Sequence, residues 1–181
     1  FTDHTTDSNL DGGNANSGDA AFDDFDDDGD IDLFVVNQNT SNVLYSNQRQ
    51  GIFKDVTETS GLKTEGGSSS VTVGDYNNDG FPDMFVSAII PGESRLYRNL
   101  GNGRFETDKD SPDIGKTLQH EEARDAVFID FDNDGYLDLL VAGKSSENDQ
   151  HGVYLYHNDA SGKLFVTDKI LPDNLSGGNK I

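Results

Sequence analysis

The sequence contains no cysteine among its 181 residues. Without cysteine there is no disulfide framework and no cysteine-based zinc site. No stretch approaches the roughly 20 consecutive apolar residues that a membrane-spanning helix requires. Basic residues are also scarce, because 13 Lys and Arg stand against 34 Asp and Glu, for a formal net charge of −21. That balance disfavours binding to nucleic acids or to anionic membrane surfaces, since both carry negative charge themselves.

Hydrophobic residues make up only 33% of the chain, and a composition this polar can indicate disorder. The apolar residues are nevertheless grouped into short runs such as LFVV, MFVSAII and AVFI, separated by Gly, Asn and Asp. Short apolar runs bounded by turn residues are typical of a protein built from many short strands. We therefore expect a folded all-β chain.

One acidic motif occurs three times, as DFDDDGDIDLFVV from Asp24, DYNNDGFPDMFVS from Asp75 and DFDNDGYLDLLVA from Asp130. The copies are 51 and 55 residues apart (75 − 24 and 130 − 75). A second motif follows each copy, with a Leu-Tyr pair, an Asn two residues after the Tyr, and a closing Phe at Phe53, Phe105 and Phe165. Each unit predicts four short strands, and its length is close to that of a β-propeller blade. A solenoid is the alternative, although its repeats are usually shorter.

The repeats predict three blades at 11–62, 63–114 and 115–170, with 1–10 as the end of a preceding blade and 171–181 as a linker toward the next. The segment FTDHT at Phe1 aligns with FKDVT at Phe53, which suggests the last strand of an upstream blade. A propeller ring typically closes with about four to eight blades, and fewer would leave open sheet edges. The expected fold class is an all-β propeller segment of about three four-stranded antiparallel blades, taken from a larger ring.

The acidic motif has the composition of a calcium-binding loop. With the first Asp as position 1, oxygen-bearing side chains recur at positions 1, 3, 5 and 9, and a Gly at position 6 permits a sharp turn. The carbonyl of position 7 can supply a further oxygen, and this number of hard ligands on a flexible loop favours Ca²⁺ over Mg²⁺. We name the motifs loop 1 (24–32), loop 2 (75–83) and loop 3 (130–138), and expect one Ca²⁺ in each. The candidate ligands at positions 1, 3, 5, 7 and 9 are Asp24, Asp26, Asp28, Asp30 and Asp32; Asp75, Asn77, Asp79, Phe81 and Asp83; and Asp130, Asp132, Asp134, Tyr136 and Asp138.

Two other interpretations of the loops are less consistent with the sequence. An EF-hand needs a bidentate Glu at position 12 and flanking helices, whereas Val35, Val86 and Val141 stand there within β-type runs. Solvated Asp-Gly turns are common in hairpins, but three copies with the same oxygen positions and the same Gly disfavour that explanation. Three bound Ca²⁺ would contribute +6 and move the net charge from −21 to −15.

The acidic loop followed by LYxNxGxGxF resembles the FG-GAP/VCBS repeats of integrin-α-like β-propellers. The segment FKDVTETSGL after Phe53 is similar to repeats of the ASPIC/UnbV and cartilage-acidic-protein group. The resemblance covers essentially the whole chain and implies a four-stranded antiparallel blade with Ca²⁺ between its first two strands. Asn77 departs from the pattern at one ligand position and weakens that site slightly. The absence of a literal FG…GAP string weakens the case for an integrin-type ligand head, but not for the blade.

These observations favour a non-enzymatic, calcium-stabilised propeller scaffold from a secreted or surface-exposed protein, whether extracellular, on the cell surface or periplasmic. Its calcium sites would be structural, and its loops would bind a protein or glycan partner in an adhesion role, with no nucleic acid and no membrane insertion. No catalytic residue is assigned, because the chain lacks a nucleophile elbow and a phosphate-loop lysine. The alternative is that these are the non-catalytic blades of a calcium-dependent polysaccharide lyase or hydrolase.

Two further segments bear on function. The connection DSPDIGKTLQHEEARDA, from Asp110 to Ala126, is the least repeat-like part of the chain. Extra residues in repeat proteins often map to a binding face, so we expect this connection to contact a partner. His157 occupies a repeat position held elsewhere by Ser46 and Arg98, which predicts a surface position without a transition-metal or catalytic role.

Overall fold

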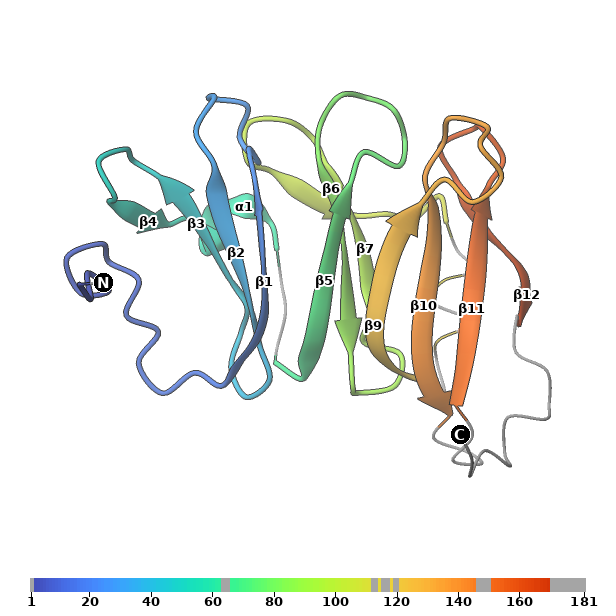
Figure 1. Cartoon of the computed structure of the whole chain (residues 1–181), viewed down its shortest axis with the longest axis horizontal. Helices are drawn as coiled ribbons and strands as arrows, with labels where there is room; N and C mark the ends of the chain where they lie inside the picture. Colours follow the sequence, from blue (N-terminus) through green and yellow to red (C-terminus); the bar gives the residue numbers. More distant parts are fainter. Residues whose placement is uncertain are drawn as a thin grey trace.

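The structure is a computed structural model that describes residues 2–62, 66–111, 114, 118, 121–145 and 151–169. It contains three four-stranded sheets, and within each sheet neighbouring strands are antiparallel and follow one another along the chain (Figure 1). The short helix α1 (Thr57–Ser60) follows the first sheet. In the part of the chain that the structure describes, no helix has the length and apolar character needed to cross a membrane.

Each sheet forms one blade, and the three blades repeat the same up-and-down order of strands. The predicted fold class, an all-β propeller segment with three four-stranded antiparallel blades, is therefore confirmed. Each blade takes its strands from one of the three ranges expected, while the assignment of the connecting segments to blades stays a prediction. The strands are β1 (Ser17–Asp23), β2 (Asp32–Asn37), β3 (Val43–Asn47) and β4 (Phe53–Asp55) in blade 1; β5 (Ser68–Gly74), β6 (Asp83–Ala88), β7 (Arg95–Asn99) and β8 (Phe105–Thr107) in blade 2; and β9 (Glu121–Ile129), β10 (Asp138–Ser145), β11 (His151–Asn158) and β12 (Leu164–Lys169) in blade 3.

The first strands of the blades, β1, β5 and β9, lie next to one another through the middle of the molecule (Figure 1). Each carries a register shift at the same repeat position, at Gly18, Ser69 and Arg124, six residues before its acidic loop. The three acidic loops join the first and second strands and lie along one edge of the molecule, at the top of Figure 1. The repeated topology therefore gives all three loops the same setting.

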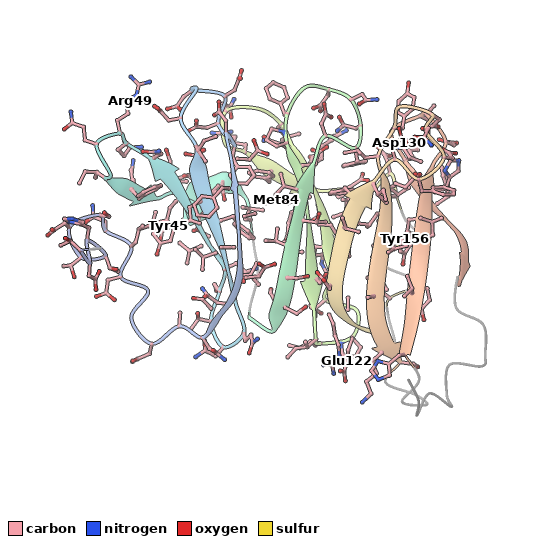
Figure 2. The ribbon with its side chains drawn as sticks, viewed as in Figure 1. Tyr45, Arg49, Met84, Glu122, Asp130 and Tyr156 are labelled. Carbon is pink, nitrogen blue, oxygen red and sulfur yellow. The ribbon has the colours of Figure 1, made fainter. Side chains whose placement is uncertain are left out.

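The core consists of two layers, one between each pair of consecutive blades. Between blades 1 and 2, Phe25 and Phe34 pack in one buried cluster with Met84, and Met84 lies between the two sheets in Figure 2. Between blades 2 and 3, Phe85 and Tyr156 belong to the second cluster. The second strand of blade 2, β6, is thus covered on both faces, by Met84 on one side and Phe85 on the other. This explains its continuous apolar sequence, which differs from the alternation of a strand with one solvated face.

Two sequence-based expectations differ from the structure. The residue that pairs with the motif asparagine in blade 3 is Leu164, not Phe165. It stands six residues after Asn158, the same spacing that separates Phe53 from Asn47 and Phe105 from Asn99. Residues 2–10 form turns in place of the expected last strand, and Phe1 lies outside the described residues. A strand forms when its backbone pairs with a neighbour, whereas among the described residues of this segment the hydrogen bonds to β4 involve Ser8 and Asn9.

The connection at 110–126 is described only in part, and its contact with a partner stays a prediction. Ile114 and Leu118 are buried in the layer between blades 2 and 3. The carbonyl of Leu118 accepts a hydrogen bond from the backbone N–H of Gly92 at 3.0 Å. These two residues therefore serve packing, while residues 112–113, 115–117 and 119–120 lie outside the described part of the chain.

Candidate metal centres

The three acidic loops share one backbone conformation. Position 4 has a positive φ in each loop, at 59° for Asp27, 56° for Asn78 and 61° for Asn133. The Gly at position 6 has φ values of 87°, 92° and 92° in loops 1, 2 and 3. Asp and Asn tolerate the left-handed region better than most residues, and Gly adopts it without strain. The residue type at position 4 thus suits a left-handed backbone conformation, which explains why it is Asp in one loop and Asn in the others.

Hydrogen bonds inside each loop curl the backbone around the position-1 carboxylate. Both oxygens of Asp24 accept backbone N–H groups, from Asp28 at 3.1 Å and from Gly29 at 2.9 Å. Asp75 and Asp130 make the same pair of contacts with positions 5 and 6 of their own loops, at 2.9–3.0 Å. The position-5 carboxylate in turn accepts the N–H of position 7 in all three loops. The curl turns alternate side chains toward a common centre.

Position 9 is the first residue of the second strand and is buried. Asp32 is 2% exposed, and Asp83 and Asp138 are 0% exposed. One oxygen of each accepts the backbone N–H of the motif asparagine at 2.8 Å. The second oxygen accepts the position-2 N–H in loops 1 and 3, at 3.1 and 3.0 Å. Each blade therefore carries a buried carboxylate at the start of its second strand.

Loop 2 leaves one of these buried oxygens without a partner. Oδ2 of Asp83 is buried and accepts no hydrogen bond of normal geometry. The Tyr76 N–H nearby lowers the pKa of Asp83 slightly without making such a bond. In loop 1, Oδ1 of Asp26 is also buried and unpartnered. A buried carboxylate oxygen without a donor is costly, and a cation is a partner that would satisfy it.

Burial raises the pKa values of several of these carboxyl groups. Desolvation is the main cause for Asp83, whose pKa is raised to about 8, with further increases from Asp79 and Asp75. Desolvation also raises the pKa of Asp32 to about 6 and, together with the charge of Asp28, raises the pKa of Asp26. The loops thus hold carboxylates whose charges neither solvent nor the described cationic side chains compensate.

The predicted side-chain ligands come together to different degrees. Carboxylate oxygens lie within 4.8 Å of one another for Asp24, Asp26 and Asp28 in loop 1 and for Asp130, Asp132 and Asp138 in loop 3. Figure 2 shows Asp130 in the loop between β9 and β10. In loop 2 the oxygen of Asn77 accepts the N–H of Asp79 at 2.9 Å. These oxygen-only sets have the chemistry that a hard cation such as Ca²⁺ requires.

The position-7 residues were expected to contribute backbone carbonyls to the metal site, not side-chain oxygens. The carboxylate of Asp30 forms an ion pair with Arg49, which extends from the turn between β3 and β4. Phe81 and Tyr136 carry no acidic side chain. The carbonyl is thus the candidate ligand at this position in all three loops, and the assignment stays a prediction.

The sequence did not predict that one further residue lies near loop 3. His157 is only partly exposed, and its Nδ1 lies 3.0 Å from Oδ1 of Asp138 and 3.8 Å from Oδ2 of Asp132. His157 thus lies at the surface but faces the acidic loop, a contact that the sequence did not predict. In blade 1, Ser46 contacts Asp26 from the same repeat position at 3.3 Å. The repeat position was the available signal, but the different chemistry of Ser, Arg and His concealed that it faces the acidic loop.

Comparisons with known proteins agree with the geometry. Residues 24–86, 85–141 and 130–180 each match the family model of the FG-GAP-like repeat. The chain belongs to the FG-GAP-like repeat family. The first and third of these FG-GAP-like matches begin at position 1 of an acidic loop, at Asp24 and Asp130. The resemblance inferred from the repeated motifs is thereby confirmed.

Two relatives of this FG-GAP-like chain are informative. Cartilage acidic protein 1 of Mus musculus is 33% identical over 122 residues, which are 64% of this chain and 18% of that protein. A solved structure concerns a lectin of Agrocybe aegerita and its specific recognition of non-reducing terminal N-acetylglucosamine. It matches with a TM-score of 0.51 and 20% identity, over 84% of this chain and 38% of the lectin chain. The chain thus spans less than half the length of either relative, and the likeness to the lectin concerns the fold alone.

Proposed function

We propose that this FG-GAP-like chain is a calcium-binding propeller scaffold in which each blade holds one structural Ca²⁺ in its acidic loop. The observation that carries the proposal is the buried position-9 carboxylate, above all Asp83. This side chain is fully buried beside Asp75 and Asp79, and its Oδ2 has no hydrogen-bond partner. A cation would satisfy that oxygen and offset the repulsion among the three carboxylates.

The donor set supports calcium over smaller or softer metals. Within the described loops the groups that lie close together are carboxylates, in loops 1 and 3, and the sequence has no cysteine. Ca²⁺ accepts six to eight oxygen ligands of roughly this kind in flexible geometry, whereas Mg²⁺ requires a stricter octahedron and retains its waters. The ion would bridge positions 1, 3 and 5 of the loop to position 9 of the second strand, and so fasten the hairpin of each blade.

This role suits a compartment where calcium is abundant. Open loops of this type bind with Kd values on the order of 10⁻⁴–10⁻³ M in extracellular modules. We infer that the protein acts outside the cytosol, in an extracellular, cell-surface or periplasmic setting. The chain would then present its loops to a protein or glycan partner. The glycan recognition of the lectin with a similar fold supports that class of partner.

Chelation tests the calcium proposal directly. At a calcium concentration ten times Kd, each site adds about 1.4 kcal/mol to the free energy of unfolding, so three sites add roughly 4 kcal/mol. For a chain of this size the melting temperature should fall by roughly 10 °C when EDTA replaces calcium. Differential scanning calorimetry measures the shift, and magnesium at the same concentration is the control. Equal melting temperatures with calcium and with EDTA would rule the proposal out.

A further inference from the structure

A buried asparagine connects each acidic loop to the loop of the preceding blade. Asn99 and Asn158, the last residues of β7 and β11, are 1% and 0% exposed. The backbone N–H of each donates to the position-9 aspartate of its own loop. The side-chain Nδ2 crosses the blade interface and donates to the position-2 carbonyl of the preceding loop. Asn99 reaches the oxygen of Phe25 at 3.0 Å, and Asn158 reaches that of Tyr76 at 2.7 Å.

The position-2 residue is in turn fixed to its own loop. The N–H of Phe25 donates to Oδ2 of Asp32 at 3.1 Å, and its fully buried ring packs edge-on against Phe105 of blade 2. Gly103, with φ at 69°, also donates its N–H to the Phe25 carbonyl at 3.2 Å. A Cβ on Gly103 would lie 3.2 Å from the Cβ of Asp26. The turn of blade 2 therefore rests directly on loop 1.

Blade 1 shows the same asparagine without the contact between blades. The N–H of Asn47 donates to Oδ1 of Asp32 at 2.8 Å, and its Nδ2 donates to the Ile31 carbonyl at 2.9 Å. No preceding acidic loop is present in the described part of the chain, and a Cβ on Gly51, the counterpart of Gly103, would meet nothing within 4 Å. Contacts within a blade can therefore be separated experimentally from contacts between blades.

We propose that Asn99 and Asn158 are positioning residues that couple cation binding at neighbouring acidic loops, an inference that rests on the proposed calcium function. A cation in loop 1 fixes Asp32 and, through its hydrogen bond, the Phe25 peptide. The fixed carbonyl orients Asn99, whose N–H holds Oδ1 of Asp83 and leaves Oδ2 for the cation of loop 2. Binding at loop 1 thus orders part of loop 2 in advance, so calcium binds with positive cooperativity.

Isothermal titration of the chain with CaCl₂ tests this coupling through a double-mutant cycle. Loop 1 is disabled with Asp24→Asn and Asp28→Asn, and the calcium affinity of the remaining loops is measured with and without Asn99→Ala. With Asn99 in place, disabling loop 1 should lower that affinity about fivefold or more, the lower end of typical coupling. With Asn99→Ala, disabling loop 1 should leave the affinity unchanged. Asn47→Ala is the matched control and should preserve the coupling between the blades.

The outcomes separate coupling from a purely structural role. If Asn99 only supports packing, Asn99→Ala lowers the melting temperature. Disabling loop 1 then changes the calcium affinity equally with Asn99 and with Asn99→Ala, and this result overturns the proposal. Calcium binding with a Hill coefficient of one in the unaltered chain overturns the coupling but leaves the calcium function intact. Absence of calcium binding overturns both. If Asn99→Ala does not fold, Asn158→Ala with loop 2 disabled provides the same cycle for loop 3.

Discussion

Replacing Asp83 with Asn isolates the electrostatic cost of a buried loop carboxylate. Asp83 is completely buried, Oδ1 accepts the N–H of Asn99 at 2.8 Å, and Oδ2 has no donor. Asn keeps an oxygen acceptor for Asn99 and cannot ionise. Without calcium we therefore expect Asp83→Asn to be more stable than the unaltered protein at neutral pH. With calcium we expect the opposite order, because the variant lacks one charged ligand.

The magnitude follows from the pKa of the buried carboxyl group. Burial raises the pKa of Asp83 from 3.8 to about 8, so the calcium-free folded protein must keep this group protonated at pH 7. Neutral pH lies about three units above the unfolded pKa, and each unit is worth about 1.4 kcal/mol, so the cost is on the order of 4 kcal/mol. The Asn variant avoids this cost, and its advantage in EDTA should reach a few kcal/mol.

Urea denaturation of both proteins at pH 7, with EDTA and with saturating calcium, measures the difference. Asp138→Asn is the comparison variant, because Asp138 is equally buried but its second oxygen accepts the Phe131 N–H at 3.0 Å and its first lies 3.0 Å from Nδ1 of His157. An amide nitrogen there would face a donor, so this variant should be destabilised in both buffers. If Asp83→Asn is less stable than the unaltered protein in EDTA, Asp83 acts as a hydrogen-bond acceptor whose charge is already compensated, and the reasoning fails.

Three other predictions follow from the structure. Folded Asp83 holds a proton at pH values where the unfolded chain does not, so the calcium-free protein should lose stability as pH rises from about 4 to about 8. Urea midpoints across that range check the sign, and a midpoint that rises with pH would contradict it. Gly103→Ala should destabilise by roughly 1 kcal/mol more than Gly51→Ala, because both glycines have positive φ but only Gly103 touches a preceding loop; equal thermal shifts would contradict that contact. Phe25→Ala should cost about 3–5 kcal/mol and Phe131→Ala much less, because the equivalent rings are 0% and 49% exposed; equal urea midpoints would contradict this layered core.

The sequence was sufficient to predict the blades because their pattern occurs three times. A single apolar run such as LFVV is compatible with a strand or a buried helix segment. Its recurrence after Asp32, Asp83 and Asp138, at nearly constant spacing, excludes most alternatives. The curled loops were predictable for the same reason, since a recurring Gly at position 6 indicates a backbone position with positive φ, which every copy shows.

The contacts between blades were not predictable from the same pattern. The recurrence of the motif asparagine indicated a structural role, but its partner Phe25 lies 74 residues before Asn99 in the chain. Periodicity relates equivalent positions and carries no information about which loop each side chain reaches. Phe165 was chosen as the closing residue of the third unit because it matched the residue type of the other copies, whereas the hydrogen-bond register places Leu164 opposite the motif asparagine.

The position-9 aspartates explain why an acidic loop and an apolar strand are adjacent in every repeat. Each is the first residue of the second strand of its blade, whose apolar residues pack in the layers between blades, and its carboxylate is buried with them. Hydrophobic replacement of a buried charged group is often neutral or stabilising, so stability alone does not favour a carboxylate here. An apolar side chain could neither accept the N–H of the motif asparagine nor ligate a cation. Blade packing and cation binding therefore depend on the same residue, and a change at one of these aspartates should alter both.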